Sequence, residues 1–234
     1  MYNYCLFCEQ KMAPDFSWKQ LFVPLRSALL CQWCKDQLRP ITGRICKVCC
    51  RSLETFTIAR ENDTCYDCIR WEKHKQWQGM IDKNVSLYEY NNFLKEFFAR
   101  FKYRGDYVLA KAFSLEVNQL IRSLDFDIAV PIPLSKERLY ERGFNQAKAI
   151  ATEAGIVTTD LLSRTHTEKQ AKKSRMERIK LRQVFKAKTV EKLTGKTILL
   201  IDDIYTTGST VRHAARALKE VGAHRVLSFT LARG

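Results

Sequence analysis

The chain has 234 residues, of which 46% are hydrophobic and 28% are charged. This composition is typical of a globular protein and excludes an intrinsically disordered chain. No segment approaches the roughly 20 consecutive apolar residues that a membrane-spanning helix requires, and the first ten residues lack the basic and apolar regions of a signal peptide. We therefore expect a cytoplasmic protein with one sizeable core and a small accessory module.

The formal net charge of +15 is larger than solubility requires. A protein this basic usually binds polyanions, such as nucleic acid, phosphorylated metabolites or an anionic membrane surface. The alternative is a lysine-rich surface that has no specific ligand. The charge therefore indicates a class of ligands and names none of them.

All nine cysteines lie within the first 68 residues, and eight of them form four C-x-x-C pairs. The eight are Cys5, Cys8, Cys31, Cys34, Cys46, Cys49, Cys65 and Cys68. Two such pairs complete a tetrahedral sulfur site for Zn²⁺, so four pairs predict two structural Cys₄ sites. Pairing in sequence order closes loops of 22 and 15 residues, while a cross-braced arrangement remains open. The ninth, Cys50, is expected to pack rather than to bind metal.

These cysteine-containing loops are too short and too polar to form a core alone, so we expect metal binding to supply much of their folding free energy. The segment Arg70–Lys83 that follows is charged and has no sustained apolar period, which predicts a linker or a connecting strand. We therefore place a double zinc ribbon at residues 1–78 and a second domain at residues 79–234.

In the second domain, strand-like and helix-like patterns alternate. The predicted strands are Val85–Tyr90, Phe126–Ile132, Thr158–Leu162, Thr197–Ile201 and Val226–Leu231. The predicted helices are Asn91–Phe101, Tyr107–Leu124, Leu139–Ala154 and Ser209–Val221. This alternation predicts an α/β fold with a mostly parallel sheet flanked by helices. Ligands of such sheets bind at the carboxyl ends of the strands.

The buried strand Thr197–Ile201 leads into a segment suited to a sugar phosphate. Backbone N–H groups at the start of a helix favour a dianionic phosphate, and a glycine lets the backbone approach it closely. The residues expected to bind the phosphate are Thr206, Thr207, Gly208, Ser209 and Thr210. Just before them, Asp202 and Asp203 offer carboxylates to the vicinal hydroxyls of a ribose. The alternative is an acidic turn before a helix that Ser209 caps.

The segment Ile198–Thr210 (ILLIDDIYTTGST) resembles the motif with which type I phosphoribosyltransferases bind phosphoribosyl pyrophosphate (PRPP). Together with Val130–Gln146 (VPIPLSKERLYERGFNQ), the basic stretch from Arg164 and the four cysteine pairs, it resembles the ComF family. Members of that family join a double zinc ribbon to a type I phosphoribosyltransferase domain. The resemblance implies PRPP with Mg²⁺ as the ligand, and Asp202 and Asp203 as the catalytic pair.

The resemblance also implies a loop that binds the pyrophosphate group of PRPP. Lys102, Arg104 and Gly105 lie where type I transferases have this loop, although alone they would be an ordinary basic turn. Arg138, Arg142 and Asn145 would line the same cleft, or would be solvent-exposed residues around a helix cap.

A mobile loop at Thr165–Arg182 would close over the ligand, with Thr167, Gln170 and Arg175 facing it. The surrounding segment Arg164–Lys192 contains eleven Lys and Arg against three Glu. Its alternative is a solvated basic loop.

Two functions remain open from the sequence. The family resemblance implies a competence protein for DNA uptake, with single-stranded DNA as a ligand and a ComFA-like helicase as a partner at the inner face of the membrane. The second function is a metabolic Mg²⁺-dependent phosphoribosyltransferase with a small-molecule acceptor that no motif specifies. We favour the first function, with enzymatic turnover left open.

Overall fold

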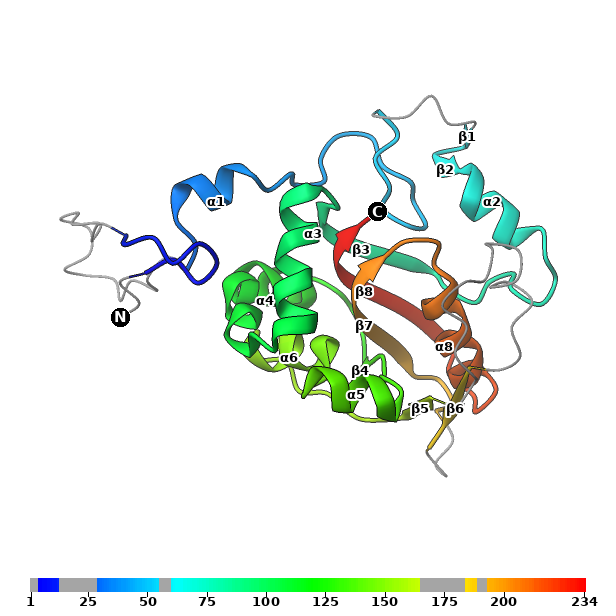
Figure 1. The fold of residues 1–234 in the computed structure, drawn as a ribbon. Coiled ribbons are helices and arrows are strands. Elements are labelled where there is room, and N and C mark those ends of the chain that lie inside the picture. The colour runs from blue at the N-terminus through cyan, green and yellow to red at the C-terminus, as the bar shows by residue number, and fades with distance from the viewer. Residues whose placement is uncertain (1–3, 13–28, 55–59, 165–183, 189–192) are drawn as a thin grey trace, which may run out of the picture.

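The computed structural model describes residues 4–12, 29–54, 60–164, 184–188 and 193–234 (Figure 1). Its central element is a four-stranded sheet in the order β3-β8-β7-β4, and every neighbouring pair is parallel. The strands are β3 (Lys83–Glu89), β4 (Ile128–Pro131), β7 (Thr197–Tyr205) and β8 (Arg225–Arg233). The predicted α/β class with a parallel sheet is therefore confirmed.

The sheet is covered on both faces, which is why β7 begins with an unbroken apolar run. Successive residues of a strand point to opposite faces. Accordingly, Leu199 and Ile201 pack into one apolar cluster, while Ile198 and Leu200 pack into another. The first cluster is built with helices α3 (Asn92–Ala99), α4 (Ser114–Arg122) and α6 (Gln146–Glu153), and the second with helix α8 (Ser209–Lys219).

Helix α3 begins where Asn91 accepts a hydrogen bond from the Leu94 amide, as an N-cap should. The predicted aromatic stripe of this helix is buried. The helix continues as a π-helical turn, η2 (Arg100–Arg104), and ends at Gly105, which has φ 72°. The predicted basic turn at Lys102 and Arg104 is therefore the helical extension of α3.

Three other predicted elements differ from the structure. Leu139–Ala154 is two helices, α5 (Lys136–Arg142) and α6, because Gly143 has φ 75° and Asn145 caps α6. Tyr107–Leu124 begins as a 3₁₀ segment, η3 (Tyr107–Phe113), before α4. The strand predicted at Thr158–Leu162 lies at β5 (Leu162–Arg164), which pairs antiparallel with β6 (Phe185–Ala187).

The N-terminal segment holds short elements around its cysteines. They are α1 (Gln32–Asp36), β1 (Arg60–Glu61), β2 (Thr64–Cys65) and α2 (Tyr66–Glu72). The prediction of a linker at Arg70–Lys83 was wrong in part, because α2 extends to Glu72 and because Trp71, Trp77 and Ile81 are buried. The division at residues 78 and 79 stays a prediction.

Each cysteine group packs against a different face of the sheet. Cys5 and Cys34 belong to the apolar cluster that contains α3. Cys49 and Cys68 belong to the cluster that contains α8. In Figure 1, α1 accordingly lies towards α3 and α2 lies on the side of α8.

Candidate functional site

The predicted ribose and phosphate residues lie at the carboxyl edge of the sheet. Strand β7 extends to Tyr205, four residues beyond its predicted end. Asp202 and Asp203 therefore lie in the strand itself and not in a loop after it, and Asp202 pairs in register with Thr230 of β8. The chain then turns at Thr206–Gly208 and enters α8.

Gly208 is the N-cap residue of α8, with φ 75°. A Cβ at this position would overlap the Tyr205 hydroxyl and the Arg212 guanidinium, so both the backbone torsion and the space require glycine. Ser209 is the first residue of the helix rather than its cap. The turn thus places backbone N–H groups at the positive end of a helix dipole.

An ion pair joins the two predicted ligand loops. The Lys102 Nζ lies 2.6 Å from the Asp203 Oδ2, and both side chains are mostly buried. The Lys102 Nζ also lies 5.1 Å from the centre of the Phe98 ring, which confines the ammonium on the α3 side of the sheet. Residues 101 positions apart in the sequence are therefore in direct contact at the sheet edge.

Asp202 lies in a different electrostatic environment. Its Oδ1 accepts a hydrogen bond of 2.9 Å from the Asp203 amide. Burial, and after it the charge of Asp203, raise the pKa of the Asp202 carboxyl to about 7, although Lys102 and Arg164 act in the opposite direction. Asp202 therefore exchanges a proton near neutral pH.

Arg164, whose charge acts on Asp202, lies near two further arginines. Burial lowers the pKa of the Arg164 guanidinium, and the charges of Arg138 and Arg142 lower it further. Arg142 donates to the Gln146 side chain at 2.9 Å. Asn145, by contrast, caps α6 and donates to the Ile132 carbonyl at 2.9 Å, which gives it a structural role.

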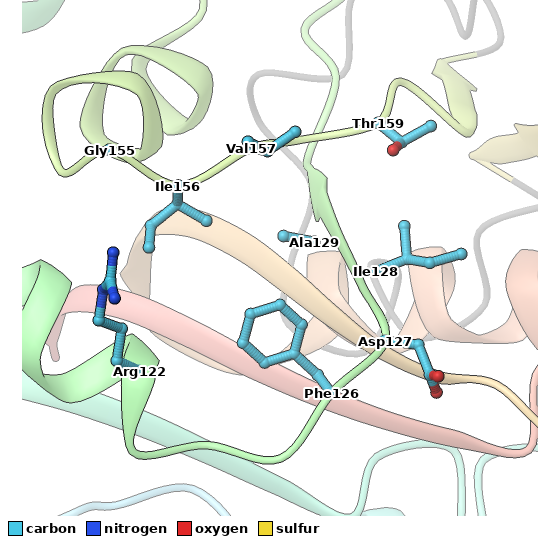
Figure 2. Close-up of a pocket in the computed structure, with 9 residues that line it drawn as sticks. All are labelled: Arg122, Phe126, Asp127, Ile128, Ala129, Gly155, Ile156, Val157 and Thr159. Atoms are coloured by element: carbon cyan, nitrogen blue, oxygen red, sulfur yellow. The ribbon is translucent and has the colours of Figure 1, made fainter.

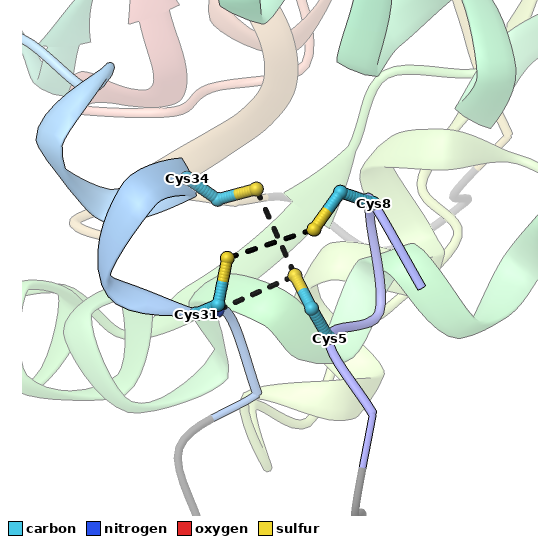
Figure 3. Close-up of side chains that lie close together, drawn as sticks. All are labelled: Cys5, Cys8, Cys31 and Cys34. Carbon is cyan, nitrogen blue, oxygen red and sulfur yellow. Dashed lines mark hydrogen bonds between the residues drawn. The ribbon is translucent and has the colours of Figure 1, made fainter. Parts of the chain in front are cut away.

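The two cysteine groups are paired in sequence order, as the simpler prediction had it. The first group is Cys5, Cys8, Cys31 and Cys34, and the second is Cys46, Cys49, Cys65 and Cys68. Figure 3 shows the four side chains of the first group converging on one point. The cross-braced alternative is excluded.

The sulfur geometry of both groups fits a tetrahedral metal. Zn²⁺ with Zn–S bonds of about 2.3 Å would place its sulfurs about 3.8 Å apart. The Cys5–Cys34 and Cys8–Cys31 sulfurs lie 3.7 and 3.6 Å apart, and the Cys49–Cys65 sulfurs 3.6 Å. Either group therefore has the donors and the spacing to hold Zn²⁺.

Cys50 takes no part in either group. It follows the knuckle with φ 62°, as Glu9 does after the first knuckle. Its side chain is buried, and its sulfur lies 3.9 Å from the Ser86 carbonyl. The expectation that Cys50 packs is confirmed.

The comparisons with known proteins agree with this architecture. A family model described as the phosphoribosyl transferase domain matches residues 139–234. The chain is 38% identical over 233 residues to the competence protein ComFC of Bacillus subtilis. The alignment covers 98% of this chain and 94% of that protein. The chain belongs to the ComF family.

Two further relatives extend the comparison. The ComFC of Streptococcus pneumoniae is 33% identical and is aligned over 98% of this chain and 99% of its own length. The DNA utilization protein YhgH of Escherichia coli is 26% identical, over 87% of this chain and 96% of its own length. The family's combination of a cysteine-rich segment with a type I phosphoribosyltransferase fold is therefore present here.

A third ligand-binding loop, the mobile loop at Thr165–Arg182, was expected from the family resemblance. Thr167, Gln170 and Arg175 lie outside the described residues. The loop begins directly after Arg164 on β5, and Arg164 lies close enough to Asp202 for their charges to interact. Its ligand-facing role stays a prediction.

Three residues behind the predicted phosphate turn, Trp71, Arg212 and Arg233, were not among the predicted site residues. Each contacts the turn between Tyr205 and Gly208. For two of them the sequence signal was a charged residue at a position predicted to be buried, since Arg212 lies on the apolar face of α8 and Arg233 ends the buried strand β8. For Trp71 the signal was a tryptophan within the expected linker.

A pocket of about 360 Å³ lies away from this site (Figure 2). It is lined by residues around the amino end of β4, including Phe126, Ile128 and Ile156. Because the strands are parallel, this end is opposite to the edge that carries the phosphate turn. None of the predicted ligand residues lines the pocket.

Among the described helices, none combines the length and the apolar character needed to cross a membrane.

Proposed function

We propose that this ComF-family chain binds PRPP with Mg²⁺ at the carboxyl edge of its sheet and acts with incoming single-stranded DNA in competence. The observation that carries the proposal is the meeting of the two predicted ligand loops in the Lys102–Asp203 ion pair of 2.6 Å. The names of the relatives, as competence and DNA utilization proteins, support the biological role.

In this proposal each part of the edge binds one part of PRPP. The amides of the turn ending at Gly208 bind the 5-phosphate, as helix N-termini do. Asp202 and Asp203 accept hydrogen bonds from the ribose hydroxyls, and Lys102 and Arg104 neutralise the diphosphate. When bound with PRPP, Mg²⁺ would neutralise part of the remaining negative charge of the diphosphate.

The ion pair also gives Lys102 a role in ligand exchange. Without ligand, Lys102 neutralises the buried carboxylate of Asp203. An arriving diphosphate competes for the ammonium, and the carboxylate is then available to the ribose hydroxyls. Binding of the diphosphate and of the ribose would thus be coupled through one side chain.

Isothermal titration with Mg–PRPP tests the proposal. We expect saturable binding, and we expect Asp203→Asn to weaken it at least about tenfold, since a hydrogen bond to a charged group contributes about 1.5 kcal/mol or more. Asp160→Asn is the matched control, because Asp160 is an exposed acid paired with Lys148. Absence of binding, or equal affinity of D203N and the wild type, would remove the proposal.

For DNA, the support is a basic surface with exposed aromatic rings beside the same edge. Tyr103 and Tyr140 are 75% and 91% exposed, and the Arg142 guanidinium lies 5.8 Å from the Tyr103 ring centre. Bases of single strands stack on such rings, and arginines neutralise the backbone. The net charge of +15 has the appropriate sign.

Fluorescence anisotropy with a labelled oligothymidine tests this part. Affinity should fall steeply with salt, because phosphate contacts release counterions, and Tyr103→Leu should weaken binding about tenfold. Tyr66→Leu is the control, since Tyr66 is also exposed and has Arg70 over its ring at 5.6 Å. Equal losses of affinity in Y103L and Y66L would show that the DNA does not bind specifically at Tyr103. An affinity that does not change with salt would contradict DNA binding.

One observation favours the transferase as a second function. The pKa of Asp202 at about 7 suits a proton acceptor at neutral pH. Release of pyrophosphate from Mg–PRPP in the presence of an acceptor, lost in Asp202→Asn, would establish turnover. No release across nucleobase and amine acceptors would leave PRPP as a bound ligand only.

We also propose that Zn²⁺ occupies both cysteine groups and that a ComFA-like helicase is the partner. The sulfur spacing supports the first proposal, and family membership supports the second. Metal analysis should give two zinc ions per chain, and the helicase should co-purify with the tagged chain. A metal-free folded protein would contradict the zinc proposal, and a helicase that does not co-purify would contradict the partner proposal.

A further inference from the structure

We infer that the second cysteine group holds the phosphate turn in its binding shape through Arg212, Arg233 and Trp71, so that phosphate binding depends on this metal site and not on the first. The inference rests on the proposed function for the identity of the ligand. Its structural content, a link between the two sites, does not depend on PRPP.

The first step concerns two buried arginines. Arg212 is fully buried and Arg233 is 4% exposed, and a buried guanidinium is strongly unfavourable without a counter-charge. Within the described part of the chain, no carboxylate forms a salt bridge with either residue. The negative charge near them comes from cysteines of the second group.

The contacts of Arg233 are the most direct. Its Nη2 donates to the Cys49 sulfur at 3.3 Å, and its Nε donates to the Cys49 carbonyl at 3.1 Å. Arg212 Nη1 donates to the Tyr205 hydroxyl at 2.7 Å.

The charges of the two arginines and the metal site are complementary. One Zn²⁺ bound by four thiolates carries a net charge of about −2. Arg212 and Arg233 together carry the opposite charge. Hydrogen bonds to ligand atoms from neighbouring groups also orient such sites.

The second step concerns the other ends of the same side chains. Arg233 Nη1 donates to the carbonyls of Tyr205 at 3.2 Å and Thr206 at 3.0 Å. Trp71 Nε1 donates to the Thr207 carbonyl at 2.8 Å. Arg212 Nη1 lies 3.5 Å from the Gly208 carbonyl. The Thr206 and Thr207 carbonyls are therefore held by groups on the side of the second cysteine group, while the Tyr205 and Gly208 carbonyls also accept from the amides of Gly234 and Arg212.

This arrangement fixes the direction of the amides. In a trans peptide the C=O of one residue and the N–H of the next point in opposite directions. The Thr206 and Thr207 carbonyls, held from this side, therefore direct the N–H groups of residues 207 and 208 away from it. A row of N–H groups directed to one side is the geometry that binds phosphate.

The aromatic side chains complete the link. Trp71 lies on α2, three residues after the ligand Cys68, and its ring is 4.8 Å from the Arg212 guanidinium carbon. Trp77 packs edge-on against Trp71 at 5.4 Å. The Trp77 Nε1, unlike that of Trp71, has no hydrogen-bond partner among the described residues.

Among the described residues, none links the first cysteine group to the turn in this way. Its nearby arginine, Arg100, donates to the Phe7 carbonyl and pairs with two carboxylates, those of Glu9 and Asp106, each at 3.1 Å. The described contacts of this group thus lead to the α3 side of the sheet. It therefore serves as an internal control.

The mildest test compares Trp71→Phe with Trp77→Phe. Both variants keep an aromatic ring and all metal ligands, but only W71F removes a hydrogen bond to the turn. We expect both to retain two zinc ions per chain. In W71F, hydrogen exchange of the amides of residues 206–209 should accelerate and the affinity for Mg–PRPP should fall about tenfold, while W77F should match the wild type in both.

A second pair tests the metal sites. Cys68→Ser and Cys8→Ser should each lose one zinc ion, but only C68S should show faster exchange at residues 206–209. If the turn of one-zinc C68S is as protected as in the wild type, or if W71F and W77F behave alike, the inference is wrong. Should wild-type protein fail to bind Mg–PRPP, the proposed function fails, and the exchange data still decide this inference.

Discussion

The two cysteine groups have the same C-x-x-C motif and similar sulfur–sulfur distances, yet the structure places them in different surroundings. In the first group Cys8 is exposed and Cys31 half-buried, whereas all four cysteines of the second are buried. The first packs with α3 and the second with α8. The difference teaches that a metal motif defines a local site, and that the neighbours of the site decide whether it also supports a ligand loop.

Stepwise removal of metal should break this comparison most strongly. We expect a chelator to take the metal of the first group first, because Cys8 is exposed. Mg–PRPP binding and most stability should survive this step and be lost with the second ion, since structural zinc contributes on the order of 10 kcal/mol to folding. A colorimetric zinc indicator measures the release of each ion, and calorimetry measures Mg–PRPP binding and stability at each step. Loss of binding with the first ion would contradict it.

Replacing one arginine beside each group gives the next largest difference. Arg233→Gln removes the cation that contacts the buried second cysteine group, and we expect the free energy of unfolding to fall by about 3 kcal/mol. Arg100→Gln removes partly exposed pairs, and about 1 kcal/mol should be lost. Urea unfolding of both variants is the measurement. Equal losses would show that burial does not separate the two regions.

Two glycines with the same φ of 75° sharpen the contrast at the level of the backbone. Gly143 has open space where a Cβ would lie, so Gly143→Ala should cost only the torsional strain, about 1 kcal/mol. Gly208→Ala adds overlap with Tyr205 and Arg212, and about 3 kcal/mol should be lost together with PRPP binding. Thermal unfolding and titration of the pair decide this prediction.

A pH dependence is expected at Asp202, on the strand between the two faces. The pKa of this carboxyl is about 7 in the folded protein and about 3.9 in an unfolded chain. Between these values the folded state binds more protons, so the stability contributed by the protonated carboxyl is complete below pH 4 and falls as the pH rises towards 7.

Asp202→Asn removes this titration. We therefore expect D202N to be more stable than the wild type at pH 8 and similar to it at pH 4, while its affinity for Mg–PRPP is lower. Melting temperatures across this pH range measure the effect. If D202N were less stable than the wild type at pH 8, the ionised Asp202 carboxylate would be stabilised by its partners in the folded state, and the prediction would be wrong.

Much of the fold was predictable because its signals are local. The run at Thr197–Ile201 and the alternation around it predicted the parallel sheet, and the C-x-x-C spacing predicted both metal groups. Errors arose where one residue changed the backbone, as Gly143 does between α5 and α6. The π-helical turn at Lys102 was missed because its charged residues resemble those of an ordinary turn.

The sequence by itself determined the class of fold and the two sulfur sites and predicted the phosphate turn, because periodicity and short spacing involve only a few neighbouring residues. Only the tertiary structure decided what stands behind the turn. The Trp71–Thr207 contact spans 136 positions, and the Arg233–Cys49 contact spans 184. Contacts across such distances depend on which faces of the sheet meet which segment, and no local pattern carries that information.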